Sequence, residues 1–419
     1  MKILRNIIVG IGVLAALLCA LIILSAANPG ITQTLSSLLS GDGLPSKEEE
    51  SGETIEVEEP EFSDQLSDPS SEAGEEEEEE PEDDSALPEE EEEMGTRLTV
   101  QRQPEEPERG ISDQKSSGAR VRGMNGYEPP AESGVSVPEA VSGKSGYQPI
   151  TEKSEELPDA EGGEYTSDLG YGETGDNLSF DSIFYPYYQM LDQKGQHLYR
   201  QIYANAAAYN AAFVPIEAVP VSELKDVVMA VYNDHPELFW LNTIFTCRYD
   251  QNKICAELEL EFNMTLEELT ASSKTFYNIT NEILSQVQNL GTYEKEARLH
   301  DILIERVEYD KGADKNQSAY SALVDGKSVC AGYARAYQYL MQRAGIPCFY
   351  CTGYAGQDHA WNIVGLDDGY YNVDVTWDDT EGGQYDYFNK TDEMYADTHV
   401  RRELSVNLPK CEGQRYVVP

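Results

Sequence analysis

Positive charge is scarce in this chain. Its 419 residues include 30 lysines and arginines against 77 aspartates and glutamates, and the formal net charge is −47. No basic stripe interrupts this acidity. Nucleic-acid binding depends on clustered lysines and arginines that neutralise phosphates, so the sequence predicts no nucleic-acid partner.

The shortage is most extreme between Glu48 and Glu93, where the chain has no lysine or arginine. This stretch contains two unbroken acidic runs, Glu75 to Glu80 and Glu89 to Glu93. Self-repulsion and a lack of apolar residues leave such a segment extended. We therefore predict a disordered linker over residues 28–179, acidic at first and then rich in glycine, proline and serine, with folded sequence starting near Phe180.

Two similar tetrapeptides lie in the second half of that linker. They are Gly126-Tyr-Glu-Pro129 and Gly146-Tyr-Gln-Pro149, and they start 20 residues apart. Two copies are too few for a repeat fold. They are either docking motifs or incidental linker composition, and the sequence favours the second reading.

Long apolar runs are also rare, and the one that matters is at the N-terminus. Residues 7–27 carry no charge, and as a helix they would cross a hydrocarbon core of about 30 Å. Basic Lys2 and Arg5 precede them, which predicts a cytoplasmic segment over 1–6 and an extracytoplasmic, membrane-anchored remainder. Ser25-Ala-Ala27 resembles a cleavage site, so a cleaved signal peptide and a secreted protein are the alternative.

Cysteine and histidine are too few and too scattered for an obvious metal site. Cys348 and Cys351 have redox or zinc spacing, but no second pair of ligands matches them, so they are predicted to be structural thiols or a disulfide. Asp378 and Asp379 are predicted to lie in a solvated loop. The sequence therefore predicts neither a metal nor a cofactor.

Cys247 and Cys255 flank a turn signal at Asp250-Gln-Asn252. If Tyr249 lies opposite Lys253, the two cysteines face each other across a hairpin. In an exported protein, this register predicts a cross-strand disulfide.

The 240 residues from Phe180 onward are enough for one large domain or two small ones. We divide them into a smaller α+β region over 180–291 and a second domain over 292–419. Apolar spacing and capping signals predict helices over 191–213 and 221–233, strands over 243–249 and 253–262, and helices over 265–288 and 292–307. With further strands towards the C-terminus, this order indicates an α+β fold.

The stretch from Ser328 to Arg335 begins a predicted helix that ends at Ala344-Gly-Ile-Pro347, so Cys330 lies at the N-terminus of this helix. Unpaired N–H groups and the helix dipole at a helix N-terminus favour an anion, so this position lowers the pKa of a thiol towards the reactive thiolate. A lone cysteine is more often a small buried hydrophobe. The histidine and aspartate that follow Cys330 in the chain favour the catalytic interpretation.

His359 opens one strand-like run, and Asp374 lies in the next, after a turn signal at residues 367–369. If Leu366 lies opposite Gly369, Asp374 is opposite Trp361 and shares a face with His359 at the diagonal site, where side chains can touch. A loop over residues 368–369 would place Asp374 further off, and a loop with an odd number of residues would place it on the wrong face. The first register is preferred.

Four motifs together resemble the transglutaminase-like superfamily of papain-related cysteine enzymes, as found in membrane-anchored or exported bacterial proteins. They are Cys330-Ala-Gly-Tyr-Ala334, Gly345-Ile-Pro347, His359-Ala-Trp361 and Tyr371-Asn-Val-Asp-Val-Thr-Trp-Asp378. The resemblance runs from about Thr292 to about Tyr395. It implies a catalytic helix packed on an antiparallel sheet, with Cys330 as nucleophile, His359 as general base and acid, and Asp374 holding the imidazole tautomer.

Such a site predicts an extracytoplasmic enzyme that acts on amide bonds of peptides or proteins, for example cell-envelope proteins, through a thioester. Water would make it a peptidase or amidase and an amine would make it an acyltransferase, and the sequence leans to hydrolysis without deciding. Trp361 is an aromatic that could shield the histidine but is placed outside the catalytic set. The alternative is a non-catalytic binding module, which a buried Cys330 in a closed groove would favour.

Overall fold

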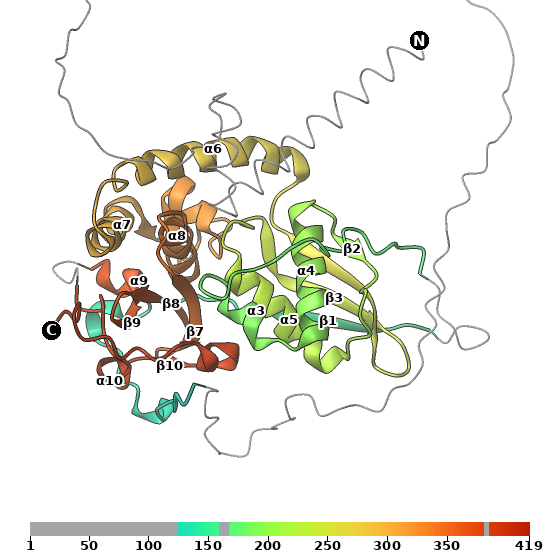
Figure 1. The fold of residues 1–419 in the computed structure, drawn as a ribbon, viewed down its shortest axis with the longest axis horizontal. Helices are drawn as coiled ribbons and strands as arrows, with labels where there is room; N and C mark the ends of the chain where they lie inside the picture. Colours follow the sequence, from blue (N-terminus) through green and yellow to red (C-terminus); the bar gives the residue numbers. More distant parts are fainter. Residues whose placement is uncertain (1–124, 159–166, 381–384) are drawn as a thin grey trace, which may run out of the picture. The chain divides into compact units, whose positions relative to one another are not determined.

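The computed structural model describes residues 125–158, 167–380 and 385–419 (Figure 1). The predicted cytoplasmic segment at 1–6, the apolar run at 7–27 and the acidic runs lie outside these residues. Within the described residues, no helix combines the length and the apolar character that membrane crossing requires.

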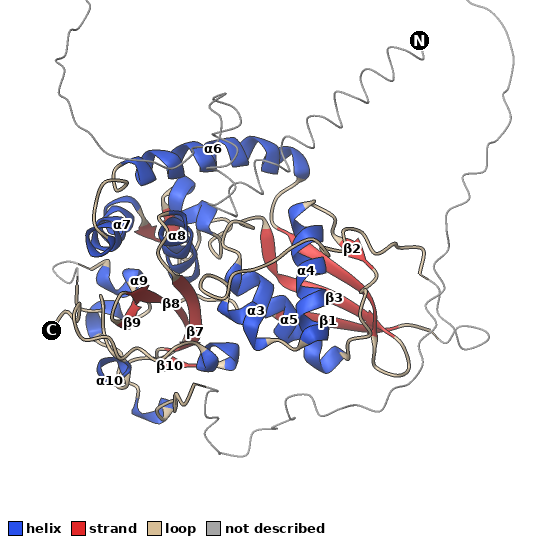
Figure 2. Ribbon diagram, viewed as in Figure 1, coloured by secondary structure: helices blue, strands red, loops and turns tan. Residues whose placement is uncertain are grey.

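A four-stranded sheet with the strand order β1-β3-β4-β2 forms the first layered unit (Figure 2). Its strands are β1 (Thr151–Glu156), β2 (Ala212–Phe213), β3 (Leu241–Tyr249) and β4 (Cys255–Phe262). Three helices accompany it, namely α3 (Pro186–Met190), α4 (Gln193–Ala207) and α5 (Val221–Asp234). In α5, the residues buried against the core include Leu224, Val227, Val228 and Val231, the apolar stripe that predicted the helix.

Strand β1 corrects the predicted linker boundary. Thr151–Glu156 pairs in parallel with β3, with Thr151 beside Ile244, so folded sequence starts well before Phe180. The strand is almost entirely exposed and lies at an edge of the sheet. It is held by backbone hydrogen bonds and not by an apolar face, so its sequence carries no alternation that could have revealed it.

The predicted pairing of Cys247 with Cys255 is wrong. Cys247 lies opposite Leu258 and Cys255 lies opposite Tyr249, because the register shifts between Arg248 and Tyr249. The loop is longer than predicted, since the Asp250 carboxylate accepts hydrogen bonds from the N–H groups of residues 252 and 254. The disulfide expectation therefore loses the geometry on which it rested.

The second unit is built around a central helix and a sheet with the strand order β10-β7-β8-β9. The strands are β7 (Cys348–Tyr354), β8 (Asp358–Leu366), β9 (Gly369–Val373) and β10 (Val400–Arg401). The helices are α6 (Leu266–Ser285), α7 (Thr292–Arg306), α8 (Cys330–Arg343), α9 (Val375–Asp378) and α10 (Asp392–Tyr395). Helix α8 packs against β7 and β8, while α6 and α7 pack against α8.

Helix α8 is buried along nearly its whole length. Its C-terminus has the hydrogen bonds of a Schellman motif, from Gly345 N–H to Gln342 and from Ile346 N–H to Met341. Gly345 has φ +81°, a conformation that glycine adopts without strain. The helix therefore ends where the sequence predicted, and it starts at Cys330, two residues after the predicted start at Ser328.

The other cysteine pair, Cys348 and Cys351, lies on β7 with both side chains buried. Cys348 is opposite Val364 and Cys351 is opposite Trp361. Neither cysteine is in a disulfide, so of the two expectations for this pair the structural thiols are correct.

Candidate active site

Cys330 is the first residue of α8, directly after a short parallel pair of strands, β5 (Glu308–Tyr309) and β6 (Lys327–Ser328). The hydroxyl of Ser328 bonds to Ser321 Oγ at 2.7 Å and to the Asn316 carbonyl at 2.9 Å, which fixes the entry to the helix. Gly332 follows one turn later, where a Cβ would lie 1.8 Å from Ser328 Oγ. Only glycine fits this approach, so the local sequence sets the position of the thiol.

His359 and Asp374 meet as the preferred hairpin register predicted. Leu366 pairs with Gly369, and Asn362 pairs with Val373, which puts Asp374 beyond the end of β9 on the face that carries His359. His359 Nε2 and Asp374 Oδ2 are 2.7 Å apart, and both residues are buried. The two-residue turn thus converts a separation of fifteen positions in sequence into a direct contact.

Asp374 is held as an anion. Its Oδ1 accepts hydrogen bonds from the N–H groups of Thr376 and Trp377 at the start of α9, and its Oδ2 faces two histidines. Burial by itself would raise the pKa of this carboxyl, but the charge and hydrogen bond of His359 and those of His399 hold the pKa well below its usual range.

The surroundings of His359 favour the protonated form of its ring. Burial lowers the pKa of the imidazole, but the charges of Asp374 and Cys330, with hydrogen bonding to both, raise it to about 10. Nδ1, the ring nitrogen that does not face Asp374, is buried and makes no well-formed hydrogen bond among the described residues. Since the thiol of Cys330 acts on the pKa of this ring, Nδ1 is the atom available to exchange a proton with it.

Sequence reasoning missed a second histidine at the site. His399 Nε2 lies 3.1 Å from the same oxygen of Asp374, and His399 Nδ1 is 2.8 Å from the Thr398 hydroxyl. Burial is the main cause that lowers the pKa of His399 to about 4, so the ring is neutral and donates Nε2–H to the carboxylate. His399 lies 25 positions after Asp374 in no motif of its own, so no signal in the sequence pointed to it.

Aromatic rings enclose the two histidines. The Trp377 ring lies 5.4 Å from His359 and 4.5 Å from His399, while Trp361 lies 6.2 Å from His359 and nearly parallel to it. Tyr395 stacks on His399 at 4.3 Å. These rings keep water from the Asp374 carboxylate, so its hydrogen bonds act in a medium of low dielectric.

The prediction of a solvated loop at Asp378 and Asp379 is wrong. Asp378 is buried and bonds to His300 Nε2 at 3.0 Å, and Asp379 accepts a hydrogen bond from the Tyr333 hydroxyl at 2.7 Å. The partner of Asp378 lies 78 positions earlier in the chain, a distance over which the sequence pattern carries no pairing information. Burial raises the pKa of Asp378 to about 6.

His359, Asp374 and His399 bring donor atoms within 4.8 Å of one another, a grouping that could hold a metal ion. The sequence predicted no cluster of this kind. Both histidine contacts to Asp374 are, however, hydrogen bonds of ordinary length, and they satisfy its Oδ2 atom. The grouping therefore has a complete explanation as a proton-holding network.

Residues 278–375 match the model of the Transglutaminase-like superfamily. This segment is a transglutaminase-like superfamily domain. It includes Cys330, His359 and Asp374 but ends before His399. It starts earlier and ends earlier than the span from Thr292 to Tyr395 expected from the motifs.

Two solved structures are similar to parts of the chain. One is described as "a Putative Cysteine Protease from Cytophaga hutchinsonii", with 25% identity over 25% of this chain and 37% of that one, and a TM-score of 0.22. The other is a TGase, with 12% identity over 39% of this chain and 50% of that one, and a TM-score of 0.24. The chain thus spans half or less of each relative's length. No curated protein matches it.

Proposed function

We propose that the transglutaminase-like domain is a cysteine enzyme that acts on amide bonds of peptides or proteins. The observation that carries this proposal is the 2.7 Å contact between His359 Nε2 and Asp374, which leaves Nδ1 of the same ring for the thiol at the start of α8. The three residue types, their order in the chain and their geometry are those that thiol acyl transfer needs.

The chemistry follows from the positions of the protons. Nδ1 of His359 takes the proton of Cys330, and the sulfur attacks the amide carbonyl carbon to form a tetrahedral intermediate. The C–N bond then breaks as His359 returns the proton to the leaving amine, which leaves a thioester on Cys330. Water or a second amine, deprotonated by His359, attacks the thioester and releases the acyl group. Asp374 remains ionised and holds the ring in place.

The raised pKa of His359 favours the protonated imidazolium form, which Asp374 stabilises, before substrate arrives. We place the enzyme outside the cytoplasm, tethered through the apolar run at 7–27 or secreted after its cleavage, with cell-envelope peptides or proteins as substrates. These assignments rest on the sequence pattern.

One observation favours the rival reading, a binding module that keeps the fold without catalysis. Cys330 and His359 are both fully buried, so neither is open to solvent. The intact hydrogen-bond geometry of the site speaks for the enzyme, because a binding module has no need of an ionised aspartate behind a histidine.

The test is a set of substitutions assayed for two activities. Cys330→Ala and His359→Ala should each abolish both ammonia release from a glutaminyl peptide with an added amine and cleavage of a peptide library. Asp374→Asn should reduce kcat by about 10²- to 10⁴-fold, because it removes only the stabilising charge. The double variant Cys330→Ala, His359→Ala should be hardly worse than either single one.

Cys247→Ala is the matched control, since this cysteine lies in β3 of the other sheet and should leave both activities unchanged. Ammonia release together with incorporation of the added amine into the peptide would identify a transferase. Ammonia release without incorporation would identify an amidase, and library cleavage alone would identify a peptidase. Full activity in the Cys330→Ala protein would refute the enzyme and leave the binding module.

A further inference from the structure

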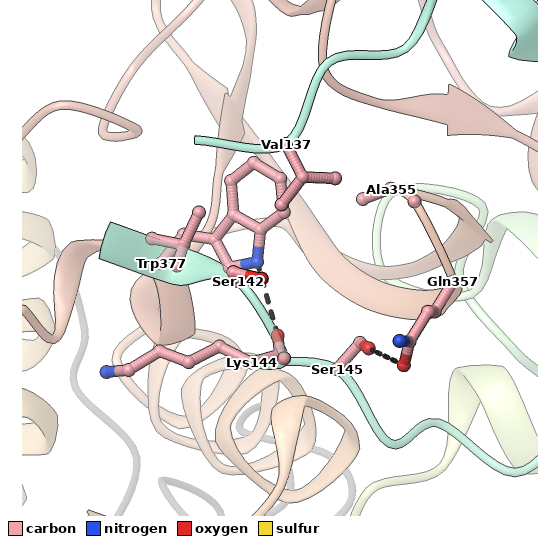
Figure 3. Close-up of a pocket in the computed structure, with 10 residues that line it drawn as sticks. Val137, Ser142, Lys144, Ser145, Ala355, Gln357 and Trp377 are labelled. Atoms are coloured by element: carbon pink, nitrogen blue, oxygen red, sulfur yellow. Dashed lines mark hydrogen bonds between the residues drawn. The ribbon is translucent and has the colours of Figure 1, made fainter. Parts of the chain in front are cut away.

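A short segment early in the described chain binds two side chains that lie beside the candidate site. We name residues 137–147 the strap. Its backbone carbonyls bind side chains of the domain. The Lys144 carbonyl accepts from Trp377 Nε1 at 3.2 Å (Figure 3), and the Gly143 carbonyl accepts from the Tyr309 hydroxyl at 3.1 Å. The Tyr309 hydroxyl also donates to the Ser145 carbonyl. These side chains belong to β5 and α9, the elements on either side of the site.

The same side chains adjoin the reactive groups. The Trp377 ring is 5.4 Å from the His359 ring. Tyr309 pairs with Ser328, which lies two residues before Cys330 in the chain. Gly146 contacts Val329, the residue directly before Cys330. The strap therefore passes between the wall formed by Trp377 and the N-terminus of α8.

We propose that the strap occupies the groove in which an extended peptide substrate binds, and that it keeps Cys330 covered in the full chain. This inference deepens the proposed function and rests on it for the identity of the substrate. The donors that hold the strap are side-chain N–H and O–H groups that bind backbone carbonyls. Such donors can bind the backbone carbonyls of any extended peptide. Because Gly146 lies where a side chain does not fit, we expect a glycine at the equivalent position of the substrate.

Gly146 is the position where the fit is tightest. Its φ is +153°, and a Cβ on it would lie 3.0 Å from Val329 Cγ1 and 3.6 Å from the Tyr309 hydroxyl. A side chain at this point would therefore both strain the backbone and push the strap away from the start of α8. On the domain side, Gly356 has φ +77° and leaves room for Val137 of the strap.

The first of the two similar tetrapeptides precedes the strap in the chain, and the second overlaps its C-terminal end. Both anchor the strap to the domain. Tyr127 of the first lies under the Arg401 guanidinium, 4.3 Å from ring centroid to Cζ. Tyr147 of the second is buried with its ring 6.3 Å from that of Tyr350. Between these anchors, Arg402 holds Glu132 through two hydrogen bonds of 2.7 and 2.8 Å. Of the two interpretations of the tetrapeptides, docking onto the chain's own domain is the one that explains their burial.

The first half of the strap is held by fewer contacts than its C-terminal end. Apart from a single 3-10 turn at Glu139–Val141 it has no regular structure, and residues 138–140, 142 and 143 are exposed. Beneath it, a cavity of about 200 Å³ remains between the strap and Ala355, Gln357 and Trp377 (Figure 3). Residues 138–140 of the strap are exposed, and a segment with few buried contacts opens at low free energy. Release of the strap would therefore expose the site without unfolding the domain.

The test measures access to Cys330 in the full chain, by the rate at which iodoacetamide labels it, read by peptide mapping. Gly146→Ala should raise that rate by at least about tenfold, because it shifts the population towards the open strap. Gly134→Ala is the matched control. A Cβ at Gly134 meets nothing within 4 Å, so its labelling rate should equal that of the wild type.

Tyr127→Ala is a second route to the open state if Gly146→Ala fails to fold, since it removes the contact with Arg401. A synthetic peptide of residues 136–148 should slow labelling of the open variant, while a scrambled peptide should not. That result would locate the strap in the peptide groove. Wild-type labelling rates in both folded variants would overturn the proposal, as would equal effects of the two peptides.

Labelling needs only an exposed thiol, so it separates this inference from the proposed function. Faster labelling without any amide-bond activity would retain the strap and refute the enzyme. Activity that needs Cys330 but is the same in the wild type and in Gly146→Ala, with unchanged labelling, would retain the enzyme and refute the strap.

Discussion

At the scale of single residues, the site consists of one carboxylate shared by two histidines in different charge states. Asp374 Oδ2 contacts His359 at 2.7 Å and His399 at 3.1 Å. The pKa of His359 is raised to about 10 and that of His399 is lowered to about 4, so at neutral pH only His359 carries a proton on both nitrogens. Because the His399 ring is neutral, the negative charge of Asp374 stabilises the protonated His359 ring alone.

These opposite shifts predict how stability depends on pH. The unfolded chain binds a proton at His399 below the ordinary histidine pKa of 6.5, whereas the folded protein binds it only near pH 4. Stability due to His399 therefore rises with pH from about 4 to 6.5. His359 binds its proton more tightly when folded, so its contribution is present below pH 6.5 and is lost as pH rises towards 10.

His399→Gln should accordingly flatten the acid side of the stability curve. Glutamine keeps an N–H group for Asp374 but has no proton to gain. Thermal unfolding followed from pH 4 to 6.5 should show a smaller rise in Tm for the variant than for the wild type. A variant curve parallel to that of the wild type over this range would contradict the lowered pKa of His399.

At the scale of elements, local capping sets the ends of the helices that frame the site. Helix α6 starts with a capping box, in which the Thr265 hydroxyl accepts from the Glu268 N–H at 3.2 Å and the Glu268 carboxylate accepts from the Thr265 N–H at 2.7 Å. The Thr-Leu-Glu-Glu spacing predicted this start, because both partners lie within one turn. Such ends depend on neighbours in sequence and are readable from it.

Thr265→Ala should lower the free energy of unfolding by about 0.5–2 kcal/mol, because it leaves the N–H of Glu268 without its cap. Thr270→Ala, on the same helix and also exposed, is the control. Its hydroxyl bonds only to the Leu266 carbonyl within the helix, so alanine should be neutral or slightly stabilising. Urea unfolding of the two variants measures the difference, and equal loss in both would show that the capping box contributes nothing.

At the scale of the whole molecule, a buried arginine joins the helix that carries Cys330 to α5 of the other sheet's unit. The Arg335 guanidinium donates to the Tyr232 carbonyl and, at 2.9 Å, to the His235 carbonyl, both at the C-terminal end of α5. Its Cζ atom also lies 3.9 Å from the centre of the Tyr232 ring. A cation is favourable at the negative end of a helix, so Arg335 links the two units without a carboxylate partner in these contacts.

Arg335→Met should destabilise the protein by about 2–5 kcal/mol, since each buried carbonyl left without a donor costs about 1–3 kcal/mol. Arg298→Ala is the comparison, because its partner is exposed Glu305 and surface ion pairs contribute at most about 1 kcal/mol. Denaturant unfolding with two structural probes would measure both. A loss for Arg335→Met no larger than that for Arg298→Ala would contradict its role as the link.

Much of the fold and part of the site followed from local patterns. The bounds of α5, α7 and α8 agree with the sequence prediction to within about two residues, and the register of β8 with β9 is the one predicted, because caps, apolar period and a two-residue turn act between neighbours. The predicted register of the hairpin with Cys247 and Cys255 was wrong for a related reason. Its longer loop contains a register shift, which turn residues alone do not reveal.

The sequence by itself determined the helix that begins at Cys330 and the hairpin that joins His359 to Asp374, since each depends on residues close along the chain. Tertiary structure alone decided that His399 shares Asp374, that a polar strand at 151–156 completes a sheet, and that residues 137–147 contact Trp377 and Tyr309. These contacts join segments 25 to more than 200 positions apart and leave no periodic trace in the sequence. They exist because burial brings distant polar groups together, and each group then has to find its hydrogen-bond partner there.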